Sequence, residues 1–99
     1  MIRFMARDIQ ERLRKFGDKV GWGHSLQGLI NHLKREVEEL EADPFIEEEV
    51  ADCCIILFNI ANFLNFDLLN AVSAKQDINE TRKWAPPDED GVVEHIKED

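Results

Sequence analysis

The fold is decided by residues 26–65, which read LQGLINHLKREVEELEADPFIEEEVADCCIILFNIANFLN. In the first part of this stretch, apolar residues recur at helical spacing and give one stripe that can face a core. The stripe consists of Leu26, Leu29, Ile30, Leu33, Val37 and Leu40. Asp43-Pro44 then reads as a helix start, with Asp43 as N-cap and Pro44 in the first turn. We therefore expect helices over 26–42 and 44–65 that run antiparallel as neighbours, because their connection is very short.

The segment before this hairpin predicts one further helix and a loop. We expect the helix over residues 4–18, ending near Gly17, and a loop over residues 21–24, which read Gly-Trp-Gly-His. Ser25 follows the loop and is expected to cap the helix that begins at Leu26.

The segment after the hairpin predicts a fourth helix and an irregular tail. Asp67 can cap a helix that extends to about Lys83, and residues 85–99 contain a Pro-Pro pair followed by acidic residues and a glycine. No segment shows the strict alternation of a half-buried strand. The expected fold class is all-α, in a single domain over residues 1–99.

Composition restricts the partners that this chain can have. Twenty-one acidic residues against twelve basic ones give a net charge of −9. This charge disfavours nonspecific attraction to nucleic acid or to an anionic membrane, so an anionic ligand would need a mediating cation. The sequence has no apolar run long enough to cross a bilayer and no apolar secretion signal at its start. We expect a cytoplasmic protein.

The second half of the third expected helix, residues 53–64, is apolar nearly all the way round. A monomer's surface helix normally keeps a polar face, so this segment predicts a subunit interface. Cys53 and Cys54 are neighbours in it and are expected to be two buried, reduced thiols rather than a disulfide framework.

Two acidic pairs stand at matching positions in the hairpin. Glu36 and Glu39 lie three residues apart on one helix, and Glu49 and Asp52 lie three apart on the next. Glu39 and Glu49 are each five residues from Pro44, and the other two are each eight residues from it. Equal rise per residue then places the pairs at matching levels. Each pair flanks its apolar stripe in the same rotational sense, so the four carboxylates either face each other or all face away.

If the carboxylates face each other, their mutual repulsion calls for a hard divalent cation with oxygen ligands. Mg²⁺ is the expected ion, with Mn²⁺ as a possible substitute. A cation of this kind commonly bridges protein carboxylates to substrate phosphates, which explains how an acidic protein can bind a polyanion. Each pair alone is weak evidence, because glutamate-rich helices are common on protein surfaces.

These residues resemble the signature of the MazG-like all-α nucleoside triphosphate pyrophosphohydrolases, Glu-Glu-x-x-Glu on one helix and Glu-x-x-Asp on the next. Here it reads REVEEL over residues 35–40 and EVAD over 49–52. Arg35 stands where the family often has its first Glu, and the gap between the two halves is short. The resemblance implies an oligomeric four-helix bundle, a homodimer or homotetramer, with the metal held by Glu36, Glu39, Glu49 and Asp52. It leaves the general base open between Glu38 and one of the ligand carboxylates.

The fourth helix carries Lys75, Asn79 and Arg82 at offsets of four and three, so one face would hold two cations and an amide. A solvated basic face is the alternative reading. The resemblance implies that these residues contact phosphates and sugar, with Lys75 and Arg82 offsetting charge in the reaction. It also implies that Trp22 stacks on a nucleobase and that His24 bonds the base or a phosphate, although a tryptophan in such a loop is often a plug of the core.

The function that follows from the resemblance is hydrolysis of a nucleoside triphosphate, expected to be a deoxynucleotide, to the monophosphate and pyrophosphate. Its role would be house-cleaning of the nucleotide pool. A phosphoribosyl-ATP pyrophosphatase has the same helical metal site and is the alternative enzyme. A noncatalytic helical module whose acidic face binds a basic partner is the alternative from another class.

Overall fold

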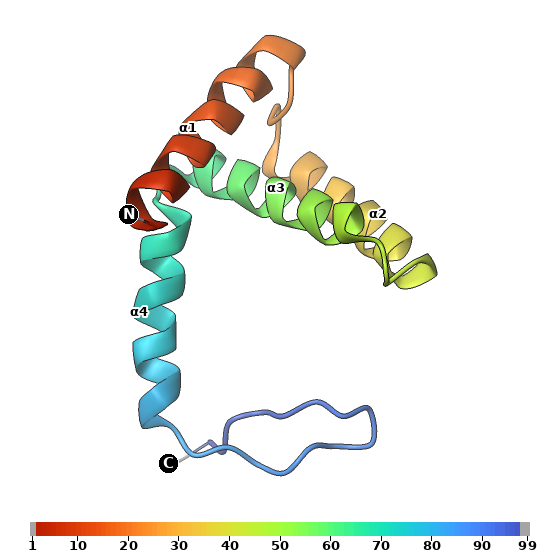
Figure 1. Ribbon diagram of the computed structural model, residues 1–99, viewed down its shortest axis with the longest axis vertical. Coiled ribbons are helices and arrows are strands. Elements are labelled where there is room, and N and C mark those ends of the chain that lie inside the picture. Colours follow the sequence, from red (N-terminus) through yellow and green to blue (C-terminus); the bar gives the residue numbers. More distant parts are fainter. Residues whose placement is uncertain (1, 98–99) are drawn as a thin grey trace. The chain divides into compact units, whose positions relative to one another are not determined.

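The computed structural model describes residues 2–97, with side chains from residue 8 onward, and it confirms the all-α fold class (Figure 1). The helices are α1 (Ile2–Val20), α2 (Leu26–Ala42), α3 (Glu47–Leu64) and α4 (Leu68–Thr81), and no strand occurs in the described range. The chain divides after Leu69 into two compact units. Among the described helices none alone is long and apolar enough to span a membrane, and only α3 with α4 as a bent pair reaches that length and composition.

The α2–α3 hairpin forms as predicted, and its two helices lie side by side (Figure 1). At the start of α2 the Ser25 hydroxyl accepts a hydrogen bond from the Gly28 N–H at 3.0 Å, so the predicted cap is confirmed. This bond satisfies one of the backbone donors that the first turn of a helix leaves without a partner.

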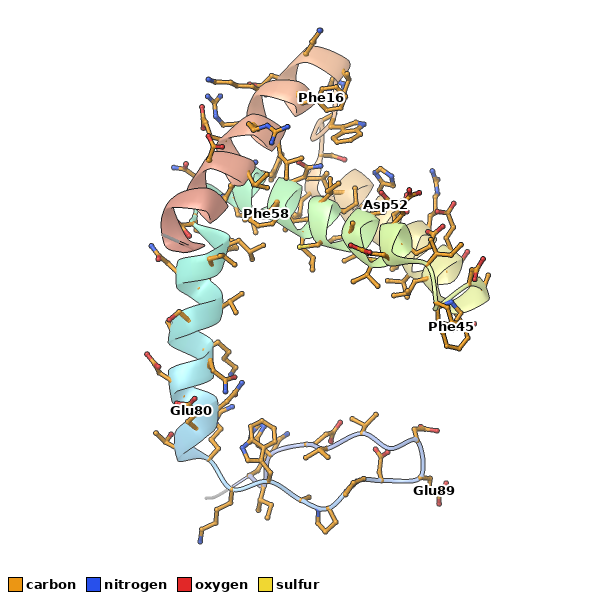
Figure 2. The ribbon with its side chains drawn as sticks, viewed as in Figure 1. Phe16, Phe45, Asp52, Phe58, Glu80 and Glu89 are labelled. Carbon is orange, nitrogen blue, oxygen red and sulfur yellow. The ribbon has the colours of Figure 1, made fainter. Side chains whose placement is uncertain are left out.

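The predicted start of the third helix was wrong. Asp43 ends α2 instead of capping α3, because its backbone N–H donates to the Glu39 carbonyl at 3.1 Å. A residue before proline is pushed away from helical geometry, and Asp43 has φ −146° and ψ 71°. The helix therefore begins only at Glu47, after Ile46, which makes no side-chain cap. The connection 43–46 leaves Phe45 95% exposed at the tip of the hairpin (Figure 2).

The first helix extends to Val20, beyond the predicted end near Gly17. Its last turn closes where the Gly17 carbonyl accepts the N–H groups of Gly21 and Trp22, both at 2.9 Å. Gly21 has φ +85°, a left-handed conformation that glycine adopts without steric cost. This turn fixes the position from which Trp22 projects toward α2.

A polar network joins α1 to the end of α3. The Gln10 side-chain amide donates to Asn62 Oδ1 at 3.1 Å and to the Phe66 carbonyl at 2.8 Å. Asn62 Nδ2 donates back to the Gln10 carbonyl at 3.1 Å, and Gln10 Oε1 accepts the Leu68 N–H at 3.1 Å. One side chain of α1 thus ties α3 to the first residue of α4, which begins directly after Asp67 as predicted.

The core lies along α3, against which both α1 and α2 pack. Its buried apolar residues among those described are Leu29, Ile56, Phe58 and Ala61. Cys53 is half-buried and Cys54 is exposed, so the prediction of two buried thiols was wrong for Cys54, although both are free thiols. The reason is that Cys54 shares an exposed side of α3 with Leu57 and Leu64, which are 42% and 49% exposed.

The second unit holds most of α4 and the segment that follows it. The helix ends at Thr81, two residues before the predicted end. The tail is non-helical as predicted over the described residues, but it folds back on itself, because the Ala85 N–H donates to the Glu94 carbonyl at 2.9 Å and the Ile96 N–H donates to the Lys83 carbonyl at 2.8 Å. Residues 98–99 of the predicted tail lie outside the described range.

Candidate metal centre

Four carboxylates from α2 and α3 converge at the edge of the hairpin. One oxygen from each of Glu36, Glu39, Glu49 and Asp52 lies within 4.8 Å of the others. Glu39 is exposed and the other three are half-buried. Of the two arrangements that the sequence left open, the flanks that face each other are therefore the observed ones.

Two oxygens of this cluster are buried without a hydrogen-bond partner among the described residues, Glu36 Oε2 and Glu49 Oε2. Burial raises the pKa of Glu36, and the neighbouring Glu39 and Asp52 raise it further. Burial likewise raises the pKa of Glu49, again with help from Glu39 and Asp52. Both shifts share two causes, burial and the like charge of neighbouring carboxylates, because each disfavours ionisation. For Glu36 a hydrogen bond with Glu39 also raises the pKa, while His32 lowers it.

The chemistry of this donor set fits a divalent cation. An octahedral Mg²⁺ with bonds of about 2.1 Å separates opposite ligand oxygens by about 4.2 Å. The four carboxylate oxygens lie within 4.8 Å of one another, which is close enough for one ion to contact several of them. The buried, unpaired oxygens of Glu36 and Glu49 are the atoms that a cation would satisfy.

A histidine that was not among the predicted site residues lies within ion-pair distance of the cluster. His32 Nε2 is 3.2 Å from Glu36 Oε1, and the unpaired oxygen of this carboxylate is the other one, Oε2. The spacing of four residues on one helix was the available signal. The ring of His32 stands edge-to-face against Trp22, with centroids 6.2 Å apart, and Trp22 stands in the same way against Phe16, at 5.3 Å.

One of the two candidates for the general base lies outside this cluster. Glu38 is exposed on α2 and lies outside the four-carboxylate cluster. Arg35, which occupies the position of the family's first Glu, is also exposed and lines a pocket beside His32. The role of Glu38 stays a prediction.

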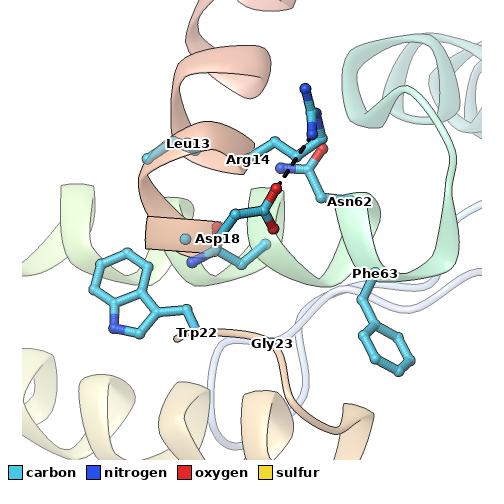
Figure 3. Close-up of a pocket in the computed structure, with 9 residues that line it drawn as sticks. Leu13, Arg14, Asp18, Trp22, Gly23, Asn62 and Phe63 are labelled. Carbon is cyan, nitrogen blue, oxygen red and sulfur yellow. Dashed lines mark hydrogen bonds and ion pairs between the residues drawn. The ribbon is translucent and has the colours of Figure 1, made fainter. Parts of the chain in front are cut away.

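Trp22 borders two pockets and is 37% exposed, so it is not a plug of the core. The first pocket, of about 230 Å³, lies between the end of α1, the loop and α3 (Figure 3). Arg14 pairs with Asp18 at its wall, 3.3 Å apart, and Asn59 lines it as a buried residue whose Nδ2 has no partner among the described residues. The second pocket is lined by His24 and His32, so the structure brings the predicted Trp22 and His24 together.

The basic residues of the prediction belong to the second unit. Lys75 is exposed on α4, Asn79 is half-buried, and Arg82 follows the end of the helix, where its N–H donates to the Asn79 carbonyl at 3.2 Å. Asn79 and Arg82 line one pocket together with Trp84, whose indole N–H donates to the Asn79 carbonyl at 3.0 Å.

A family model, two curated relatives and a solved structure that are similar to this chain agree with one another. The family model described as dATP/dGTP pyrophosphohydrolase matches residues 7–99. A dATP/dGTP diphosphohydrolase of Salmonella phage PMBT28 is 32% identical over 90 residues, which cover 90% of this chain but only 31% of that relative. One of Cyanophage S-2L is 36% identical over 83 residues, covering 76% of this chain and 78% of the relative.

A solved structure is similar over nearly the whole of both chains. It is the Cyanophage S-2L MazG-like pyrophosphohydrolase bound to dGDP and three catalytic Mn²⁺ ions per active site. The TM-score is 0.83 at 29% sequence identity, and the alignment covers 93% of this chain and 97% of the other.

Proposed function

This chain belongs to the dATP/dGTP pyrophosphohydrolase family, and on that premise we propose that it hydrolyses purine deoxynucleoside triphosphates to the monophosphate and pyrophosphate. The two viral relatives are named for dATP and dGTP, and the similar solved structure holds dGDP. The role that fits this reaction is house-cleaning of the deoxynucleotide pool in the cytoplasm.

The observation that carries the proposal is the four-carboxylate cluster with its two buried, unpartnered oxygens. Glu36, Glu39, Glu49 and Asp52 are the proposed ligands of Mg²⁺, with Mn²⁺ as a substitute. When bound, such a cation stabilises the negative charge of the phosphates and lowers the pKa of water. Four carboxylates held so close together repel one another and lower the stability of the fold when no cation is bound. A noncatalytic acidic surface does not require this arrangement.

The other residues of the site are assigned by chemistry. Trp22 offers an exposed indole to a nucleobase, and His24, in the pocket beside it, offers a ring nitrogen to the base or a phosphate. The sequence predicts that Lys75 and Arg82 supply positive charge for the triphosphate and that Asn79 supplies an amide for the sugar. These roles stay predictions, because all three residues belong to the second unit.

The attacking water gives its proton either to Glu38 or to one of the ligand carboxylates. Glu38 is exposed and one position from Glu39, so it can reach solvent beside the cluster. Glu38→Gln separates the two routes. If Glu38 is the base, kcat falls while the affinity for Mn²⁺ stays unchanged, whereas a base among the ligands leaves kcat near the wild-type value.

We further propose that a second copy of this chain covers the exposed apolar side of α3, giving a homodimer or homotetramer. Leu57 and Leu64 are each more than 40% exposed there, on the same side of the helix as Cys54. Burial of apolar area of this kind drives association between subunits. Light scattering that shows only the 11.5 kDa species contradicts this part of the proposal.

The deciding experiment is product analysis by ion-exchange chromatography, with dATP, dGTP, pyrimidine deoxynucleotides and phosphoribosyl-ATP each incubated with Mg²⁺ or Mn²⁺. We expect deoxynucleoside monophosphate and pyrophosphate from the purine deoxynucleotides. Orthophosphate as the sole phosphate product refutes the assignment, and turnover of phosphoribosyl-ATP alone supports the alternative enzyme.

Matched variants distinguish an enzyme from a noncatalytic acidic module. Glu39→Gln removes a proposed ligand, while Glu41→Gln removes the same charge from the same helix at an exposed position outside the cluster. An enzyme loses turnover in the first variant and keeps it in the second. A module that merely presents a charged face shows no hydrolysis in either variant or in the wild type.

A further inference from the structure

His32 is the one described histidine that forms an ion pair with the carboxylate cluster. Its Nε2 lies 3.2 Å from Glu36 Oε1, and its side chain is 35% exposed. This distance places the imidazole in ion-pair contact with one oxygen of Glu36, Oε1. The other oxygen, Oε2, is buried and has no hydrogen-bond partner among the described residues.

The His32 ring is itself held in place from the other side. Trp22 meets it edge-to-face at 6.2 Å, and Phe16 of α1 meets Trp22 at 5.3 Å. These contacts form a continuous chain from the end of α1 to the carboxylate. Ring packing of this kind restricts the rotamers of a half-buried histidine, so the direction of its N–H is set before any ligand arrives.

We propose that His32 is a positioning residue of the metal site, which holds Glu36 Oε1 so that Oε2 is presented to the cation. The inference rests on the proposed function in that the cluster binds a divalent ion, and it adds a residue outside the ligand set. A bond from a neighbouring group that orients a ligating carboxylate typically changes metal affinity by about 10–100-fold.

Two substitutions separate the polar contact of His32 with Glu36 from its ring packing. His32→Phe keeps an aromatic ring against Trp22 and removes the donor. His32→Gln keeps an N–H donor of similar reach and removes the ring. The matched control is His95→Phe, because His95 makes an equivalent edge-to-face contact with Trp84, at 6.0 Å.

The primary measurement is the dissociation constant of Mn²⁺ alone, followed by electron paramagnetic resonance of the free ion and by calorimetry. We expect His32→Phe to bind Mn²⁺ about 10–100-fold more weakly than wild type, His32→Gln to recover most of this loss, and His95→Phe to match wild type. The Mn²⁺ concentration for half-maximal dGTP hydrolysis should rise in His32→Phe, while kcat at saturating Mn²⁺ stays close to wild type. Thermal unfolding without metal shows that each variant is folded.

The inference is overturned if His32→Phe binds Mn²⁺ as tightly as wild type, or if Gln and Phe weaken binding equally, since the donor then does nothing specific. Either result leaves the proposed function standing as long as the wild type hydrolyses dGTP. Conversely, a wild type that binds Mn²⁺ with the expected pattern of variants but cleaves no nucleotide supports the role of His32 and refutes the proposed function. Failure of the wild type to bind Mn²⁺, even with nucleotide present, overturns both.

Discussion

The carboxylate cluster predicts that metal reverses the order of stability of wild type and Glu36→Gln. Without a cation, one oxygen of wild-type Glu36 is buried, has no hydrogen-bond partner among residues 8–97, and lies close to three further carboxylates. Replacing it with Gln removes one charge from this cluster at constant shape. We therefore expect the variant to unfold at a higher temperature than wild type in a chelating buffer.

With metal the order should invert, and the size of the effect follows from linkage. Mn²⁺ at 100 times its dissociation constant stabilises the native protein by about 2.7 kcal/mol. A domain of this size gains about 4–8 °C per kcal/mol, so wild type should gain roughly 10–20 °C. A variant whose affinity is 100-fold weaker gains only about 0.4 kcal/mol at the same concentration of Mn²⁺.

The assay is thermal unfolding followed by circular dichroism, with and without Mn²⁺ and at one fixed protein concentration, since association of subunits also shifts Tm. Glu41→Gln serves as the control for net charge, because it lies on the same helix and is exposed outside the cluster. It should behave as wild type in both buffers. If Glu36→Gln gains as much from Mn²⁺ as wild type does, the four carboxylates do not act as one cation site.

Further expectations concern pH and the supports of the fold. The pKa values of Glu36 and Glu49 are raised in the native state, so the native protein still binds protons at pH values above the unfolded pKa of about 4.3. The stability that these protons contribute is fully present below that pH. It is lost as the pH rises through the raised pKa values. The metal-free protein should thus be more stable at pH 5 than at pH 7 in urea titrations, and the difference should be smaller in Glu36→Gln. A larger difference in the variant would show that Glu36 does not cause the pH dependence. Gln10→Ala breaks the network between α1 and α3 and should lower the unfolding free energy by about 1–3 kcal/mol, and an unchanged urea midpoint would show that the network is dispensable. Ser25→Ala removes the α2 cap and should cost about 1 kcal/mol, whereas Ser25→Asp, which restores an acceptor, should recover it.

Some helix boundaries can be predicted from local sequence alone, and others cannot because the same residues are compatible with two structures. Ser25 has a single reading, a cap before an apolar stripe, and the structure confirms it. Asp43-Pro44 has two readings, because an aspartate before proline can begin one helix or end another. The backbone N–H of Asp43 is already bonded within α2, so the second reading holds, and Glu47 begins α3 three residues after the proline.

The candidate site divides in the same way. The spacing of the two acidic pairs determined that they stand at matching levels of the hairpin. These levels follow from the rise per residue of each helix, which depends only on local structure. The four residues are Glu36, Glu39, Glu49 and Asp52. The contact between His32 and Glu36 was also readable as a spacing of four. The proposed role of His32 could not be predicted from this spacing. It depends on burial of the carboxylate and on the ring of Trp22, which comes from a different segment.

The sequence by itself determined the helical class, the hairpin and the residue types available to a cation, since each depends on neighbours a few positions apart. Only the tertiary structure decided that the acidic flanks of α2 and α3 face each other, that two carboxylate oxygens are buried without a partner among the described residues, and that Glu38 stays outside the cluster. The physical reason is that the rotation of a helix about its own axis is set by the apolar side chains it packs, and that packing involves residues far apart in the chain.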